Sequence, residues 1–330
     1  MTSRTSRLLL CASAALLLAA CGNVDRDVVE ATDTVMTDAT ETASSSEQVA
    51  SYGSGDGADM DMSYGSGKTY AFDRAAMAAA LDAQDDDAKA RFAARNPAAT
   101  LEFFGIAPGM NVGDALPGGG WYTKILLPYL GEDGRMVGVN YSNDLWPNFS
   151  WMTDERMAQN VAWPQTWPEQ AREWTDNGIE IEAYTFETLP QDGSLDAFLF
   201  IRALHNLARF EDKGGFMTQA AKNTYGALKP GGVVGVVQHE APADATDEFS
   251  TGDAGYLRRA DVVAAFEAAG FVLEDSSDIN ANPRDMPSGD DIVWRLPPSL
   301  SGSRDDAEKK AEMEAIGESN RMTLRFRKPG

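Results

Sequence analysis

The side chains whose ordinary pKa lies near neutral pH are two histidines. His205 lies in "IRALHN" and His239 in "VVQHEA", and the chain has no other histidine. Each follows an apolar run directly, so we expect both just beyond the carboxyl ends of strands. An imidazole there could take a proton from an attacking oxygen or nitrogen atom. The alternative is that each imidazole only closes its strand by bonding to the backbone.

The polar residues beside the histidines admit several roles. Arg202 and Asn206 could contact a substrate or the carboxylate of a cofactor, and Arg202 could equally be the buried ion-pair partner of Asp114 or Glu240. The two histidines and Glu240 could in principle bind a metal ion. Their spacing is long, and neither H-x-x-H nor H-E-x-x-H occurs. We therefore expect no metal.

A glycine-rich turn is the second candidate for chemistry. It reads "DALPGGGWYT", from Asp114 to Thr123, between the apolar "MNVG" and the helix-like "KILLPYL". Glycines let a ligand approach the backbone, and the N–H groups at a helix N-terminus favour an anionic group. Phosphate, dinucleotide and nucleoside sites all use such turns. The dinucleotide pattern G-x-G-x-x-G would place its last glycine at Thr123, and the G-K-[ST] of a phosphate loop is absent.

Alternating apolar and amphipathic stretches must position these residues. We expect strands at 110–115, 136–140, 179–184, 197–202, 233–238 and 271–274, and helices at 121–130, 216–228 and 261–269. Runs such as "AFLFI" and "VVGVV" are apolar throughout, as strands covered on both faces must be. The order predicts an α/β fold with a doubly wound, Rossmann-like, mostly parallel sheet, whose ligands lie beyond the carboxyl ends of the strands.

Two further segments complete the predicted domain. Before the first strand, "FDRAAMAAALDAQDDDAKARFAAR" predicts an Ala-rich helix, and Asn96 is expected to cap a helix that begins at Pro97 and ends at Gly105. After the sixth strand comes an insertion, 277–320, with a charged helix at about 304–316. The alternating "RMTLRFRK" at 321–328 then predicts an edge or antiparallel strand.

Taken together, these motifs resemble the class I S-adenosylmethionine-dependent methyltransferases. Asp114 falls on the acidic position of their acidic-x-G-x-G-x-G motif, and Gly118 and Gly120 fall on its second and third glycines. "LPQDGSLDAFLF", "LKPGG" and "GF" before the fourth, fifth and sixth strands also look like that superfamily. The most similar subgroup is one of predicted exported methyltransferases with "PGGGWYT", "R-x-x-H-N" and a terminal "F-x-K-P". The resemblance covers about residues 70–330 and implies a seven-stranded sheet with one antiparallel C-terminal strand.

The resemblance also implies a cofactor, S-adenosyl-L-methionine, and a set of residues that would bind it. These are Asp114, Leu116, Pro117, Gly118, Gly119, Gly120, Tyr122, Asn140 and Glu187. The catalytic candidates beside them are His205, His239, Arg202 and Asn206. The aromatic rings of Trp121 and Tyr122 are expected in the core, or one of them could meet the cationic sulfonium.

Three positions depart from the family pattern. Leu116 replaces the first glycine, and Pro117 is expected to hold it in an extended conformation. Asn140 replaces the acid that would bind the ribose hydroxyls, so that hydrogen bond would lack charge assistance. Thr185 stands where an acid often follows the third strand, with Glu187 nearby.

The N-terminus has the pattern of a bacterial lipoprotein signal. Arg4 and Arg7 precede "LLLCASAALLLAA", a run too short to span a bilayer, and "LAAC" resembles a lipobox ending at Cys21. We expect cleavage after residue 20 and a lipid on Cys21, which would anchor the chain on the periplasmic side of the envelope, with the outer membrane favoured. A plain secretory signal is the alternative. Residues 21–68 predict a disordered acidic tether, and 69–330 a methyltransferase-like domain.

Charge and cysteine content narrow the functional classes. The formal net charge is −23 and no basic stripe occurs, which argues against nucleic acid and anionic lipid headgroups as partners. The only cysteines are Cys11 and Cys21, so the domain has no internal disulfide.

We predict an S-adenosylmethionine-dependent methyltransferase with a small-molecule acceptor in the envelope. Because this cofactor is made in the cytosol and does not cross membranes unaided, the alternative is a non-catalytic ligand-binding lipoprotein that keeps the fold. A nicotinamide oxidoreductase is third, disfavoured by the glycine spacing.

Overall fold

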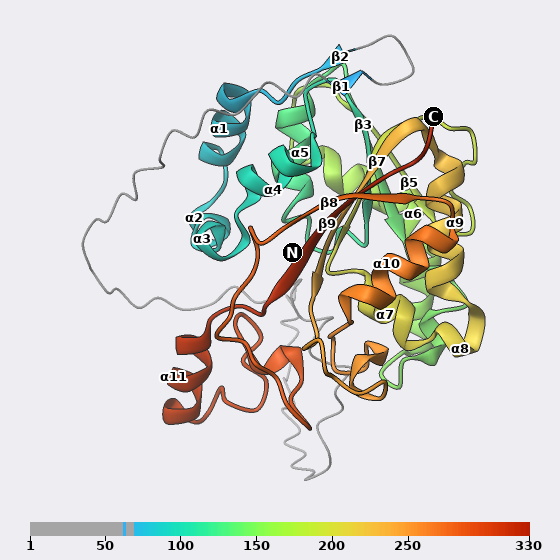
Figure 1. The fold of residues 1–330 in the computed structure, drawn as a ribbon. Helices are drawn as coiled ribbons and strands as arrows, with labels where there is room; N and C mark the ends of the chain where they lie inside the picture. The colour runs from blue at the N-terminus through green and yellow to red at the C-terminus, as the bar shows by residue number, and fades with distance from the viewer. Residues whose placement is uncertain (1–61, 64–68) are drawn as a thin grey trace, which may run out of the picture.

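The computed structural model describes residues 62–63 and 69–330 of the chain (Figure 1). The predicted signal, the lipidation site Cys21 and the predicted tether up to residue 61 lie outside the described residues. β1 (Met62–Ser63), within the predicted tether, pairs antiparallel with β2 (Thr69–Tyr70). Among the described helices, none combines the length and the apolar character that a membrane crossing requires.

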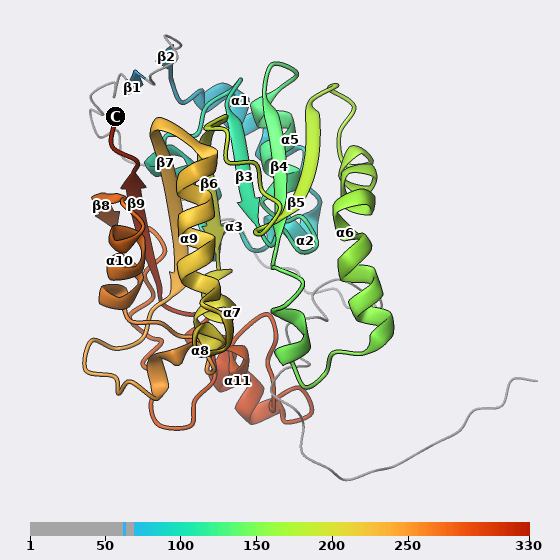
Figure 2. The same ribbon diagram turned by 90° about the vertical axis from the view of Figure 1, so that its right-hand side faces the viewer.

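A seven-stranded sheet forms the centre of the domain (Figures 1 and 2). Its strands are β3 (Asn111–Ala115), β4 (Arg135–Asn140), β5 (Glu180–Thr185), β6 (Leu195–Ile201), β7 (Leu228–His239), β8 (Val272–Ser277) and β9 (Arg321–Arg327). The spatial order is β5-β4-β3-β6-β7-β9-β8, and only β9 runs antiparallel to its neighbours. The predicted doubly wound, mostly parallel sheet with an antiparallel C-terminal strand is confirmed. β9 is an inner strand rather than an edge strand.

The strand order reverses between β3 and β6, the first and fourth strands of this sheet. In open α/β sheets the helices that follow two such strands leave on opposite faces, which opens a crevice at their carboxyl ends. The glycine turn follows β3 directly, and Arg202 follows β6. The topology therefore places the two main candidate segments at the same crevice.

Helices cover both faces of the sheet (Figure 2). They are α1 (Arg74–Asp82), α2 (Asp86–Lys89), α3 (Phe92–Arg95), α4 (Pro97–Phe104), α5 (Thr123–Leu130), α6 (Asp154–Arg172), α7 (Leu204–Arg209), α8 (Glu211–Gly214), α9 (Phe216–Ala227), α10 (Arg259–Ala268) and α11 (Ala307–Ile316). One buried cluster joins α1, α4, α5 and α6 to the sheet, and another joins α7, α9 and α10 to its other face. "AFLFI" and "VVGVV" are almost wholly buried between them, as their composition predicts.

Two expectations about the N-terminal helices are wrong in detail. The Ala-rich stretch forms three short helices, α1 to α3, instead of one. Asn96 does precede α4, but its side chain makes no capping bond, and its φ is 42°. Its Nδ2 instead donates to the carbonyl of Ile279 at 2.8 Å. The side chain therefore ties the start of α4 to the segment that follows β8.

Candidate functional site

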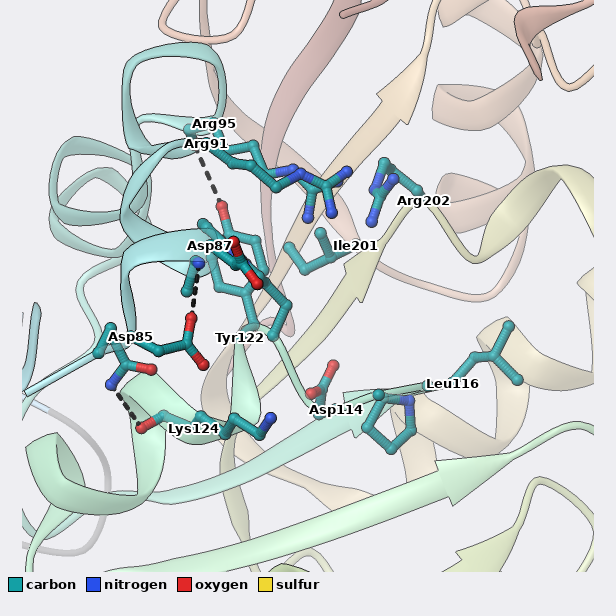
Figure 3. A pocket seen from close by; sticks show the side chains of 16 residues that line it. Asp85, Asp87, Arg91, Arg95, Asp114, Leu116, Tyr122, Lys124, Ile201 and Arg202 are labelled. Carbon is teal, nitrogen blue, oxygen red and sulfur yellow. Dashed lines mark hydrogen bonds between the residues drawn. The ribbon is translucent and has the colours of Figure 1, made fainter. Parts of the chain in front are cut away.

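Two cavities lie on either side of the glycine turn. Cavity A, of about 360 Å³, is lined by residues of α2, α3, the turn and the end of β6, namely Gln84, Asp85, Asp87, Ala88, Arg91, Arg95, Asp114, Leu116, Pro117, Gly118, Gly119, Trp121, Tyr122, Lys124, Ile201 and Arg202 (Figure 3). Cavity B, of about 410 Å³, is lined by Leu116, Pro117, Gly118, Asn140, Tyr141, Trp146, Phe149, Trp151, Arg156, Gln159, Asn160, Trp163, Gln170 and Asn206. The turn residues 116–118 border both cavities, so one elongated ligand could contact both across the turn.

Leu116 has a left-handed backbone conformation, which corrects the expectation that Pro117 holds it extended. Its φ is 50°, and its N–H donates to the carbonyl of Val139 on β4 at 2.7 Å. That bond continues the ladder beyond Ala115 and turns the chain, overriding the local preference that a following proline imposes. The position thus has the conformation that glycine adopts freely.

Arg202 repeats this geometry at the end of β6. Its φ is 59°, and its N–H donates to the carbonyl of Val237 on β7 at 2.7 Å. A non-glycine residue in this conformation costs about 1–2 kcal/mol. Such strain is found mostly at ligand sites and switches, because the surrounding structure must maintain it. Two strained residues, Leu116 and Arg202, therefore end the neighbouring strands on either side of the crevice.

The glycines of the turn differ in what they leave room for. Gly118 has φ 54°, and a Cβ added there would meet only the carbonyl oxygen of Leu116, at 3.9 Å. Gly119 is exposed and lines cavity A. Gly120 is buried, and an added Cβ would lie 2.3 Å from the ring of Trp174. Gly118 and Gly119 therefore leave space for a ligand, while Gly120 is required for packing against Trp174.

Asp114 is a buried carboxylic acid at the base of cavity A. Its Oδ2 accepts a hydrogen bond from Thr123 Oγ1 at 2.9 Å. Burial raises the pKa of Asp114 to about 7, and the Thr123 bond opposes that shift. A cationic group bound beside this carboxyl would favour its ionised form. Asp114 is thus suited to an ammonium group.

Cavity B combines flat aromatic rings with amides. The rings come from Tyr141, Trp146, Phe149, Trp151 and Trp163, and the amides from Asn140, Gln159, Asn160, Gln170 and Asn206. The buried indole Nε1 atoms of Trp146 and Trp151 have no hydrogen-bond partner in the described part of the chain. Such a lining suits a planar, hydrogen-bonding group. Sequence reasoning named Asn140 and Asn206 but missed the aromatic rings, although tryptophans recur through "DLWPNFSW" and the helix after it.

Two residues predicted to bind the cofactor, Asn140 for its ribose and Glu187 near the end of the third strand, differ in position. Asn140 lines cavity B at the end of β4; its Oδ1 accepts from the N–H of Tyr141 at 2.8 Å, and its Nδ2 lies 3.5 Å from Asn160 Oδ1. Glu187 is exposed and lines neither cavity A nor cavity B. Its Oε1 lies 3.4 Å from the N–H of Asn143. Asn140 is therefore placed to contact a ligand in cavity B.

The two histidines meet at the carboxyl edge of the sheet, as expected from their positions after strands. Their ring centroids lie 5.7 Å apart, but both side chains are buried. His205 packs edge-on against Trp294 of the 277–320 insertion and lines neither cavity A nor cavity B. His239 Nδ1 lies 2.5 Å from Ser319 Oγ. The insertion thus covers both imidazoles.

His239 borders a smaller cavity of about 40 Å³, together with Arg202, Trp294 and Glu318. Burial lowers the pKa of His239 well below its ordinary value, and the charges of His205 and Arg202 lower it further. His239 is therefore neutral at pH 7. The role of either histidine as base stays a prediction, because neither borders cavity A.

The alternatives for Arg202, Glu240 and the nearby aromatic rings are also resolved by contacts. Glu240 pairs with Arg259, with Oε1 and Nε 2.8 Å apart, and no ion pair joins Arg202 to it or to Asp114 in the described residues. No group of three or more histidine, cysteine or acidic side chains in this part of the chain could hold a metal. Tyr122 belongs to the buried cluster on the α5 face of the sheet and Trp121 packs against it, as expected, and both rings also line cavity A.

Comparison with known proteins finds solved structures of low sequence identity. No protein-family model matches the chain, and no curated protein matches it. Among solved structures, the [4+2]-cyclase SpnF is 18% identical, with 71% of this chain and 80% of that chain covered and a TM-score of 0.45. A SAM dependent methyltransferase from Aquifex aeolicus is 13% identical, with 76% and 98% covered and a TM-score of 0.42.

A third solved structure is geranyl diphosphate C-methyltransferase from Streptomyces coelicolor A3(2), in complex with Mg²⁺, geranyl diphosphate and S-adenosyl-L-homocysteine. It is 15% identical to this chain, with 78% of this chain and 88% of that chain covered and a TM-score of 0.44. The strand order described above, rather than these modest scores, establishes the fold.

Proposed function

We propose that this chain binds S-adenosyl-L-methionine and transfers its methyl group to a small-molecule acceptor in the cell envelope. The observation that carries this proposal is the pair of cavities on either side of Gly118, at the carboxyl end of the central strand β3. The room beside Gly118 supports the approach of a ligand to the backbone. The envelope location rests on the signal pattern and Cys21 alone.

The residues present suit the two ends of this cofactor. Its planar adenine and its ribose match the rings and amides of cavity B, where Asn140 would serve the ribose hydroxyls. Its ammonium group matches the buried carboxyl of Asp114 in cavity A. When bound, the cofactor supplies an electrophilic methyl group on a sulfonium.

The protein's own contribution would be positioning and exclusion of water. The turn 116–120 and the strained ends of β3 and β6 would fix the ligand against the crevice. An acceptor in cavity A would lie beside Arg202 and Tyr122. His239 is neutral at pH 7 and would act as base only for an acceptor that reaches the small cavity beside Arg202.

A calorimetric titration with S-adenosylhomocysteine tests the binding step, and two glycines give matched variants. Gly118 and Gly131 both have positive φ (54° and 72°), and a Cβ at either would meet no close neighbour. Only Gly118 lines the cavities. We expect Gly118→Ala to weaken binding at least tenfold and Gly131→Ala to leave it unchanged. No binding to the unaltered protein, or equal loss in both variants, would refute the proposed mode.

A non-catalytic binding protein with the same fold is the second candidate. The observation that favours it is the burial of both histidines under the insertion, away from cavity A. Incubation with methyl-labelled cofactor and a small-molecule extract of the envelope separates the two. Labelled product that requires the protein supports the enzyme, whereas cofactor binding without any labelled product supports the binding protein.

A further inference from the structure

Four arginines surround a single carboxylate beside cavity A. Glu318 lies 3.2 Å from each of three of them, with Oε1 next to Arg91 Nε and Oε2 next to Arg95 Nε and Arg321 Nη2. The charge of Arg202 also acts on Glu318. Burial alone would raise the pKa of Glu318, but the arginine charges outweigh it and hold that pKa at about 2. Glu318 is therefore fully ionised, and one negative charge faces four positive charges.

Two of the arginines have hydrogen-bond donors that no described residue accepts from. Arg91 Nη2 and Arg95 Nη2 are buried and have no hydrogen-bond partner in the described part of the chain. The Arg95 side chain is only 2% exposed. Burial lowers the pKa of Arg95 well below its ordinary value, and the charge of Arg202 lowers it further. A buried unpaired guanidinium donor costs stability, so a network formed only for structure would be expected to satisfy it.

These groups face a cavity large enough for a ligand. Arg91, Arg95 and Arg202 all line cavity A, and Figure 3 shows their guanidinium groups gathered on one side of it, with Asp114 and Leu116 on the other. The pKa of Asp114 responds to burial and to Thr123 but not to these arginines. Cavity A therefore has a cationic end and a separate acidic end.

Other charged groups of the cavity do not neutralise the arginines. Asp85, just before α2, and Asp87, within it, line the cavity, but both are exposed to solvent, and no ion pair joins them to the arginines in the described residues. Asp85 is engaged by the N–H of Ala88 at 2.7 Å. Lys124 adds a further positive charge, with its Nζ 5.1 Å from the ring centroid of Trp174. Cavity A thus brings three arginines and a lysine together in a chain of net charge −23.

We propose that Arg91, Arg95 and Arg202 bind a carboxylate or phosphate group of the ligand that occupies cavity A. Guanidinium groups match these anions because they donate two parallel hydrogen bonds in a fixed plane. The anion belongs either to the methyl acceptor, which is then an anionic small molecule, or to the carboxylate of the cofactor. Its assignment to one of these rests on the proposed function, whereas the anion site itself does not.

Inorganic phosphate is the probe for the site. Calorimetry at constant ionic strength would compare phosphate with chloride on the unaltered protein, on Arg202→Gln and on the control Arg135→Gln. Arg202 makes no hydrogen bond or ion pair with its side chain in the described residues, so its replacement leaves the Glu318 pairs intact. Arg135 pairs with Glu182 at 3.2 Å, on β4 and β5, away from cavity A. We expect phosphate binding that Arg202→Gln weakens about tenfold or more and Arg135→Gln does not change.

Two nucleoside ligands identify the source of the anion. S-adenosylhomocysteine carries the amino-acid carboxylate, and 5′-methylthioadenosine lacks it. If the site receives that carboxylate, S-adenosylhomocysteine competes with phosphate. Arg202→Gln then weakens the binding of S-adenosylhomocysteine but not that of methylthioadenosine. If the site receives the acceptor, phosphate binds alongside S-adenosylhomocysteine. Either result supports the anion site.

The failure of the anion site is distinct from the failure of the proposed function. Phosphate that binds no better than chloride, or that binds Arg202→Gln and Arg135→Gln equally, would overturn the anion site even if S-adenosylhomocysteine binds. Phosphate binding that depends on Arg202, without any binding of either nucleoside, would keep the anion site and reject the cofactor.

Discussion

The left-handed conformation of Leu116 predicts which of two variants, Leu116→Gly or Leu116→Ala, is the more stable. At most positions alanine is more stable than glycine by about 0.5–1 kcal/mol, because glycine loses more conformational freedom on folding. At φ 50° the order should reverse, because any residue with a Cβ is strained by about 1–2 kcal/mol there. We therefore expect Leu116→Gly to be more stable than Leu116→Ala by about 1 kcal/mol.

The stability of both variants relative to the unaltered protein depends on the packing that the leucine side chain loses. Leu116 is partly buried and packs against the core cluster on the α9 face of the sheet. Losing that contact costs both variants about 1 kcal/mol, since a fully buried leucine side chain contributes about 1.5–3 kcal/mol. Glycine recovers about this amount by releasing the strain. Leu116→Gly should thus match the unaltered protein, and Leu116→Ala should be about 1 kcal/mol less stable.

Thermal unfolding measures this difference. For a domain of this size, 1 kcal/mol corresponds to about 2–4 °C in Tm. Ala203 provides the control, because it is buried beside Arg202 but has φ −98°. Ala203→Gly should lower Tm, opposite in sign to the change from alanine to glycine at 116. If Leu116→Ala proved more stable than Leu116→Gly, the inference that residue 116 has a strained backbone would be wrong.

Three further outcomes are expected. The pKa of Asp114 is about 7 in the folded chain against an ordinary 3.8, so between these pH values the folded protein holds a proton that the unfolded chain has lost. The free energy of unfolding should therefore fall as the pH rises from about 4 to about 7. Urea unfolding of Asp114→Asn should show no such fall. Trp294→Ala should expose His205, so that diethylpyrocarbonate modifies it faster than in the unaltered protein. Gly120→Ala should lower stability by about 2–4 kcal/mol in urea unfolding, from the clash with Trp174 and the strain at φ 78°.

The strands of the sheet could be predicted because each is marked by residues within its own short segment. Apolar runs that must be covered on both faces marked β6 and β7, and the glycine turn marked the end of β3. α6 was missed because Pro164 and Pro168 lie inside it and its apolar residues show little helical periodicity. Proline normally argues against a helix interior, and here the packing of the buried Trp167 prevails.

Features of the site that depend on distant residues could not be predicted. The local effect of Pro117 on Leu116 is overridden by a hydrogen bond to β4. The positions of the histidines at the sheet edge followed from the strands, but their burial depends on Trp294, nearly ninety residues further along the chain than His205. The arginine cluster joins α3 to Glu318 across more than two hundred residues, and no pattern within either segment indicates the other.

The place of β9 in the sheet has a consequence for how the anion-binding side of cavity A forms. Among the described strands β9 comes last in sequence, yet it lies between β7 and β8, and β8 pairs with no other described strand. Until residues 321–327 enter, the sheet ends at β7, and Glu318 and Arg321 have no fixed position. A nascent chain, or one cut before β9, would therefore have its glycine turn before it could orient Arg95, so ligand recognition would wait until β9 joins the sheet.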